Sequence, residues 1–129
     1  MFIEFVGAAQ TVTGSKHLIR TKHANVLLDC GMFQGRRKEA NRLNQELGVD
    51  APSLDAVILS HAHIDHSGAL PLLVRQGFDG PIYTTPATRD LCAVMLEDAA
   101  MIQANDARFI NKTIARDRAS GLDPVEPLF

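Results

Sequence analysis

The sequence predicts an α/β fold in which short strands alternate with helices. Several short apolar segments, partly β-branched, have the length and composition of strands. Other segments carry apolar residues at helical spacing. The chain has 129 residues, 46% of them hydrophobic and 22% charged, which indicates one soluble globular domain or less.

The first third of the chain is expected to supply three strands. Residues 2–6 alternate as a strand does. Residues 15–21 and 26–29 are separated by a short turn, which favours an antiparallel hairpin. The small-residue loop 7–15 is interpreted as a tight connection, and a backbone that closely approaches a ligand is the alternative.

The middle of the chain predicts two helices around one strand. Residues 36–48 are polar and predict a short exposed helix that ends near Gly48. Residues 56–59 predict a buried strand, and residues 68–75 predict a helix with Pro71 near its first turn. The first helix carries a basic cluster, for which a solvent-facing surface is favoured over contact with phosphates. The cluster consists of Arg36, Arg37, Lys38 and Arg42.

The last third predicts a strand at 81–84 and a helix that begins at Thr85–Pro86 and extends to Arg116. Its core-facing side is expected to carry apolar residues at helical spacing. These are Leu91, Val94, Met95, Leu96, Ala99 and Ile102. A basic stripe is interpreted as a solvent-facing surface, with binding to a nucleic-acid backbone as the alternative. It consists of Arg108, Lys112 and Arg116. Residues 121–129 predict an irregular tail.

Three histidines and one carboxylate lie within six positions directly after the strand 56–59. On an extended backbone His61 and His63 would point to the same side, and a turn near Asp65 would aim Asp65 and His66 at a second point. Neutral imidazoles and carboxylates suit Zn²⁺. A polar turn with incidental histidines is disfavoured, because ordinary turns use Gly, Asn and Ser. The sequence therefore predicts a metal site between a strand and a helix.

Five further residues carry chemistry. Asp29 ends an apolar strand, and it is interpreted either as an acceptor that orients a metal-bound histidine or water, or as an ordinary turn residue. His17 is expected to be a packed or surface residue, and His23 a turn residue. Cys30 and Cys92 lie in apolar context, which predicts reduced and buried thiols.

The motif His61-x-His63-x-Asp65-His66 resembles the metal-binding signature of the metallo-β-lactamase fold superfamily. The resemblance implies an αββα sandwich, with residues 1–129 as its N-terminal part and a mixed sheet with helices on one face. It also implies that His61 and His63 bind one zinc ion and that Asp65 and His66 bind another. Asp29 and Asp65 are then the residues expected to take part in catalysis, Asp29 as support for the ligands.

Three segments point to one branch within this superfamily, namely 7–15, 28–35 and 60–71. They are similar to the β-CASP branch, whose members are RNA-processing nucleases related to the cleavage-and-polyadenylation endonuclease. The resemblance implies an RNA substrate and metal-assisted hydrolysis of phosphodiester bonds. No histidine follows His66, so the later ligands of the family and its inserted domain have no counterpart here. The chain is therefore expected to be the N-terminal piece of a larger protein.

Composition limits the other possibilities. The net charge of -2 gives no overall attraction to nucleic acid. No apolar run could span a bilayer and no signal peptide is evident, so no membrane contact and a cytoplasmic location are expected. An exposed sheet edge would favour a homo-oligomer. The alternatives are a hydrolase of small thioesters or esters, a catalytically inactive RNA-processing scaffold, and a 129-residue form that is itself inactive.

Overall fold

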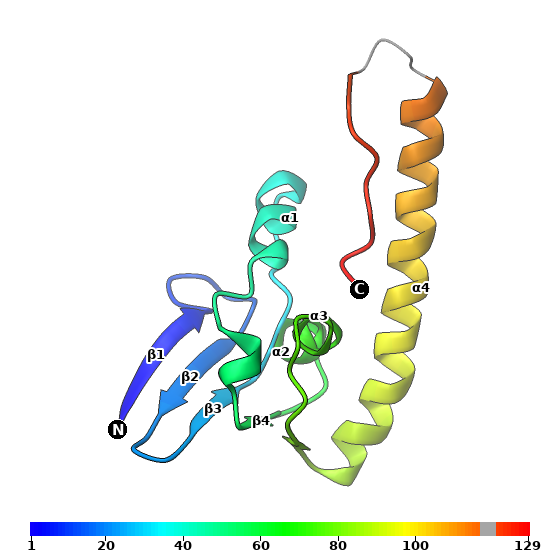
Figure 1. Ribbon diagram of the computed structural model, residues 1–129. Coiled ribbons are helices and arrows are strands. Elements are labelled where there is room, and N and C mark those ends of the chain that lie inside the picture. The colour runs from blue at the N-terminus through cyan, green and yellow to red at the C-terminus, as the bar shows by residue number, and fades with distance from the viewer. Residues whose placement is uncertain (117–120) are drawn as a thin grey trace.

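A mixed five-stranded sheet forms one side of the molecule (Figure 1). The computed structural model describes residues 1–116 and 121–129, without the side chains of residues 37 and 38, so those two members of the basic cluster lie outside the described part. The strands in spatial order are β1 (Phe2–Gly7), β2 (Lys16–Arg20), β3 (Asn25–Leu28), β4 (Ala56–Ile58) and β5 (Ile82–Tyr83). Strands β1, β2 and β3 pair antiparallel, whereas β3, β4 and β5 pair parallel. The predicted α/β fold and the hairpin are confirmed.

The helices are less regular than the sequence predicts. They are α1 (Arg37–Gln45), the 3₁₀ turn η1 (Ala51–Ser53), α2 (Ile64–Ser67), α3 (Leu70–Arg75) and α4 (Pro86–Arg116). The sequence analysis missed η1 and α2, because a single turn is too short to show a period. It also began α3 two residues early, since Gly68 still belongs to the end of α2 and donates its N–H to the Ile64 carbonyl at 2.8 Å. None of the helices in the described ranges is long and apolar enough to cross a bilayer.

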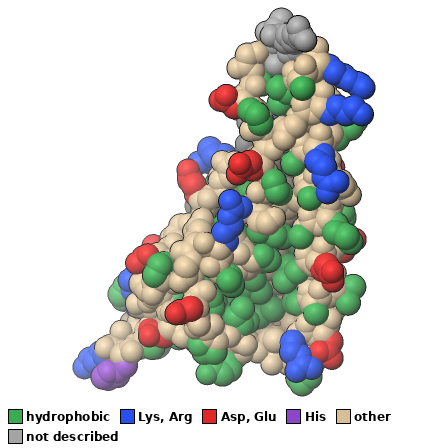
Figure 2. Space-filling view, turned by 45° about the vertical axis from the view of Figure 1, so that its right-hand side comes forward, with side chains coloured by type: hydrophobic (Ala, Val, Ile, Leu, Met, Phe, Trp, Pro, Cys, Tyr) green, Lys and Arg blue, Asp and Glu red, His purple; other side chains and the backbone are tan. Residues whose placement is uncertain are grey.

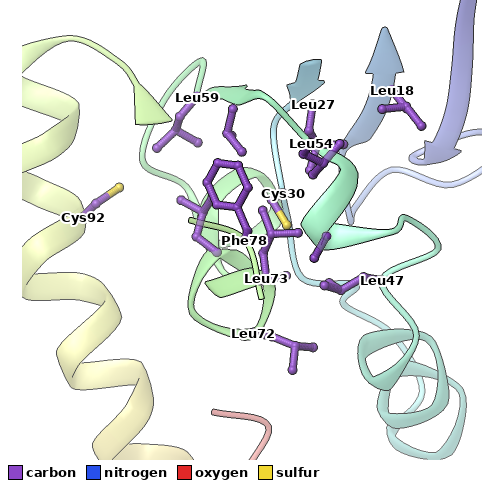
Figure 3. Close-up of a cluster of buried hydrophobic side chains, with 14 of the residues drawn as sticks. Leu18, Leu27, Cys30, Leu47, Leu54, Leu59, Leu72, Leu73, Phe78 and Cys92 are labelled. Atoms are coloured by element: carbon purple, nitrogen blue, oxygen red, sulfur yellow. The ribbon is translucent and has the colours of Figure 1, made fainter. Parts of the chain in front are cut away.

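The core lies between the sheet and the shorter helices (Figure 3). Leu18, Leu27 and Val57 lie side by side on neighbouring strands and are at most 3% exposed. They belong to one cluster with residues that follow the strands, among them Leu73 of α3 and Phe78. Burial of this face explains why the strands carry a large apolar residue at every second position.

The opposite face of the sheet is open to solvent. One row crosses all five strands in register, and it consists of Phe5, His17, Leu28, Ile58 and Tyr83. Phe5 is 67% exposed and Tyr83 is 60% exposed. The half-buried His17 ring packs edge-on against Phe5 with centroids 5.3 Å apart, as expected for a packed histidine. The prediction of helices on one face is thus confirmed.

The predicted core-facing side of α4 is partly wrong. Met95 and Leu96 do pack against the core, but Leu91, Val94 and Ile102 are each more than half exposed. The buried positions of α4 are Thr88, Cys92 and Ala107. Helix α4 stands at the end of the sheet beside α3, so only a narrow line of mostly small residues touches the rest of the molecule (Figure 1). The helix therefore has two apolar stripes, and the sequence does not show which one is covered.

The C-terminal segment 121–129 has no regular structure, as predicted, yet it is docked. It runs back beside α4 (Figure 1). The Asn111 side chain exchanges two hydrogen bonds with the backbone of Val125, at 2.8 and 2.7 Å. The Leu128 N–H donates to Gln103 at 3.0 Å, and Phe129 packs against the core.

Candidate metal centre

Parallel pairing of β3 and β4 brings two distant parts of the chain together. Leu28 is the register partner of Ile58, so both strands end at the same edge of the sheet. Asp29 follows β3 and donates its N–H to the Ile58 carbonyl at 2.9 Å. Its φ of 59° is left-handed, a conformation that aspartate tolerates better than most residues. Its side chain is thereby directed into the loop that follows β4.

The Asp29 carboxylate accepts four hydrogen bonds. Oδ1 accepts from the Ser60 N–H at 2.8 Å. Oδ2 accepts from the Ser60 hydroxyl at 3.0 Å, the Ser15 hydroxyl at 3.1 Å and His66 Nδ1 at 2.7 Å. Burial alone raises the pKa of Asp29, but the hydrogen bonds from Ser60 and His66 outweigh it and lower the pKa below its ordinary value. Asp29 is therefore an ionised and rigidly held acceptor.

These hydrogen bonds fix the tautomers of two histidines. Because an ionised carboxylate only accepts, His66 Nδ1 carries a proton and Nε2 of the neutral ring keeps its lone pair. The single hydroxyl proton of Ser60 goes to Asp29, so the Ser60 oxygen accepts from His61 Nδ1 at 3.0 Å. The Nε2 atom of His61 is then unprotonated as well, and His63 Nδ1 lies 3.2 Å from it. The same carboxylate therefore orients both rings.

The possible ligands lie in two pairs. His61 Nε2 and His63 Nδ1 are 3.2 Å apart. Two nitrogens on one tetrahedral zinc ion are separated by about 3.3 Å, as follows from bonds of about 2.0–2.1 Å. His66 Nε2 and Asp65 Oδ2 are 3.6 Å apart, and the rings of His61 and His66 have centroids 4.0 Å apart. Imidazole and carboxylate donors suit zinc, although among the described residues no group of three His, Cys, Asp or Glu side chains is placed to hold one ion.

Backbone contacts hold α2 in place beside the segment after β3. Cys30 N–H donates to His66 O at 2.8 Å, and Ser15 N–H donates to Asp65 O at 2.8 Å. A side chain at Gly31 would overlap the Asp65 carbonyl, so this approach requires glycine. The position of Asp65 and His66 thus depends on residues more than thirty positions earlier.

The loop itself differs from the extended chain that the sequence analysis expected. Strand β4 ends at Ile58, and residues 59–63 have no regular structure, yet His61 and His63 still face each other. The fully buried Ser67 hydroxyl donates to the carbonyls of Ala62, at 2.9 Å, and His63, at 3.1 Å. The sequence analysis assigned no role to Ser15, Ser60 or Ser67. A single serine carries no signal before its partners are known.

Other residues that the sequence analysis singled out lie apart from the four possible ligands. His23 is exposed in the hairpin turn, where its N–H donates to Thr21. Arg36 is exposed, and Arg42 lies 3.9 Å from Glu46, which directly follows α1. His17 touches the network only through a long contact of 3.5 Å between Nε2 and the Ser15 hydroxyl.

The arrangement of a strand-end aspartate with the His-x-His-x-Asp-His loop agrees with comparison to known families. A model of the metallo-beta-lactamase superfamily matches residues 13–127. The chain belongs to this superfamily. The predicted superfamily and the partial metallo-β-lactamase fold are thus confirmed.

Three relatives with known names indicate the branch of the superfamily that the chain resembles. The chain is 46% identical to Ribonuclease TTHA0252 of Thermus thermophilus, over 93% of this chain and 27% of that protein. It is 35% identical to Transcription termination factor FttA of Methanocaldococcus jannaschii, over 86% of this chain and 18% of that protein. It is 36% identical to Integrator complex subunit 11 of Danio rerio, over 93% of this chain and 21% of that protein. Relatives of this kind are those expected for the β-CASP branch, and the chain spans about a quarter or less of their length.

Proposed function

We propose that residues 1–129 form the N-terminal part of a zinc-dependent hydrolase that cleaves RNA phosphodiester bonds in the cytoplasm. One observation carries the proposal. Hydrogen bonds centred on Asp29 leave the Nε2 lone pairs of His61 and His66 unprotonated. Each lone pair has a second donor within 3.6 Å, from His63 and Asp65 respectively.

The roles of the residues follow from this geometry. His61 and His63 would hold one zinc ion, and Asp65 and His66 would hold the other. Asp29 orients both rings, His66 directly and His61 through Ser60. The chemistry that the bound ions supply is Lewis-acid activation of water and of the phosphoryl group. Asp29 takes part through the ligands and does not touch the substrate.

The proposal that RNA is the substrate is supported by the relatives and not by the overall charge. Ribonuclease TTHA0252 is a ribonuclease by name, and the match covers 93% of this chain. The net charge of -2 offers no general attraction to a polyanion. Binding of the RNA backbone would therefore depend on local basic residues and on parts of the protein beyond this chain.

The test compares His63→Ala with His23→Ala, because His23 is an exposed histidine outside the site. Zinc content is measured by mass spectrometry on this chain, and cleavage of a labelled RNA is measured on the longer polypeptide that contains it. We expect His63→Ala to lose zinc and cleavage while His23→Ala keeps both. Unchanged zinc content and cleavage in His63→Ala would contradict the proposal. Turnover of a thioester without RNA cleavage would retain the metal centre and reject the substrate.

A further inference from the structure

The outer face of α4 carries five exposed residues in a symmetric order. They are Asp98, Met101, Asn105, Phe109 and Lys112. Their spacings of three, four, four and three residues place them on one stripe of the helix. Met101 is 57% exposed and Phe109 is 73% exposed. From either end, the stripe has a charged residue, a large apolar residue and then the central Asn105.

The polar members of this stripe have no partner in the part of the chain that the structure describes. Asp98, Asn105 and Lys112 make no hydrogen bond or ion pair with any residue that the structure describes. The exposed side chains of Leu91, Val94 and Ile102 widen the apolar surface. Figure 2 shows hydrophobic side chains along the helix, with more Lys and Arg side chains toward its C-terminal end than toward its start. An exposed apolar surface of this kind indicates an interface.

We propose that two copies of this chain associate through this stripe, with their α4 helices antiparallel and the two-fold axis at Asn105. Positions equally distant from residue 105 then face each other. Asp98 of one copy lies opposite Lys112 of the other, and Met101 lies opposite Phe109. The two Asn105 amides meet at the axis, where a polar residue fixes the register of a helix pair. The contact is isologous, so it closes as a dimer.

The charges select both the partner and the direction. Before residue 105 the helix carries Asp90, Glu97 and Asp98 with Arg89, and after it Arg108, Lys112 and Arg116 with Asp106. A parallel pair would put Asp98 against Asp98 and Lys112 against Lys112, which is repulsive. The antiparallel pair places Asp98 opposite Lys112 and sets the half of α4 with net charge -2 beside the half with net charge +2 in the other copy. A second copy therefore offers the complementary surface that the stripe lacks within its own chain.

The apolar part of the interface is tested by Phe109→Ser. Sedimentation velocity on the 129-residue chain should show a concentration-dependent dimer, and Phe109→Ser should raise the dimer dissociation constant by about tenfold or more. The matched control is Phe5→Ser, which removes a similarly exposed aromatic side chain (67% against 73% for Phe109) from the open face of the sheet. It should leave the dimer unchanged. Circular dichroism confirms that each variant is folded.

The charged pair allows a complementation test. Asp98→Lys places lysine opposite lysine across the axis, and Lys112→Asp places aspartate opposite aspartate, so each variant alone should be monomeric. An equimolar mixture of the two variants should form a heterodimer, because each contact then joins opposite charges. A chain with both substitutions should dimerise again, and added salt should weaken the heterodimer.

Three outcomes would overturn the proposal. One is an unmodified chain that stays monomeric at 100 micromolar, a concentration set by the experiment and on the order of weak dimer dissociation constants. Another is a dimer that survives Phe109→Ser and Asp98→Lys. A third is a dimer abolished by Phe5→Ser, which would assign association to the open sheet face.

Discussion

His66 Nδ1 lies 2.7 Å from Asp29 Oδ2, although the two residues are 37 positions apart. This hydrogen bond joins the end of β3 to the one-turn helix α2. Since Asp29 also holds Ser60 through two hydrogen bonds, one carboxylate sets the orientation of ligands for both proposed ions. The centre is therefore organised from a residue that would not itself bind zinc.

Asp29→Asn tests that organisation. Asparagine keeps one acceptor oxygen and replaces the other with an NH2 donor, so it cannot accept both the hydrogen bond at Oδ1 and the three at Oδ2. The tautomers of His61 and His66 are then no longer fixed together. We expect zinc affinity to fall by about 10–100-fold. Competition with a chromophoric chelator measures it, and Asp79→Asn serves as the control because Asp79 is exposed and away from the loop. Equal affinity in both variants would show that Asp29 does not organise the ligands.

Gly31→Ala tests the close approach of the two segments. The new methyl group would overlap the Asp65 carbonyl, and relief of that overlap would move α2. We expect the free energy of unfolding to fall by about 1–3 kcal/mol, together with weaker zinc binding. Urea denaturation measures the first effect. Gly35→Ala is the control, since its added carbon would meet only Phe33 at 3.5 Å; the idea fails if the two variants lose the same stability.

Lys16→Met tests the cost of a buried ammonium group. Lys16 is 6% exposed, and burial lowers its pKa. The folded chain therefore releases this proton at a lower pH than the unfolded chain does. The cost is fully present below the folded pKa and shrinks as pH rises toward the unfolded value of about 10.4. Lys16→Met should be more stable at pH 7 by about 1 kcal/mol, and its advantage should shrink at alkaline pH.

Urea unfolding of both proteins at several pH values between neutral and alkaline isolates the contribution of Lys16. The control is Lys22→Met, because Lys22 is exposed in the hairpin turn. A constant difference between Lys16→Met and the unmodified chain across this range would contradict the argument. So would a Lys16→Met variant that is less stable at neutral pH.

Thiol labelling tests the surroundings of Cys30. Burial raises the pKa of the Cys30 thiol to about 12, although the charge of Lys16 opposes this. The protonated thiol of Cys30 is thus favoured in the folded chain. The stability that this preference contributes is fully present below the thiol pKa of the unfolded chain, and it is lost as the pH rises above that value. In a Cys92→Ser background at pH 8, Cys30 should react with iodoacetamide only after urea is added. Reaction in the folded protein at the rate of a free peptide would rule this out.

The strands could be predicted because each depends on local pattern. Alternation in residues 2–6 and the short turn between the next two strands correspond to β1 and to the β2–β3 hairpin. Helix α4 shows the limit of the same method. Leu91, Val94 and Ile102 have the spacing of a buried face, but burial depends on where the helix stands relative to α3. Periodicity identifies a helix and does not identify its neighbour.

The candidate site also has a part that the sequence predicts and a part that it does not. Its four possible ligands are adjacent in sequence, and their chemistry is visible without a structure. The roles of Ser15 and Ser60 are not visible, because they follow from the parallel register of β3 with β4 and from the left-handed φ of Asp29. The pairing of the strands determines which serine hydroxyl donates to which carboxylate. The sequence around a serine does not show that partner.

The parallel register of β3 and β4 has a consequence for how the centre comes into being. A peptide covering residues 56–70 alone would contain all four proposed ligands but neither Asp29 nor Ser15. Its imidazole tautomers would exchange freely, because the carboxylate that fixes them is absent. High-affinity uptake of zinc would then have to wait until the crossover between these two strands has docked. During refolding, the time at which a zinc-sensitive dye reports zinc uptake would then mark the time at which β3 and β4 pair.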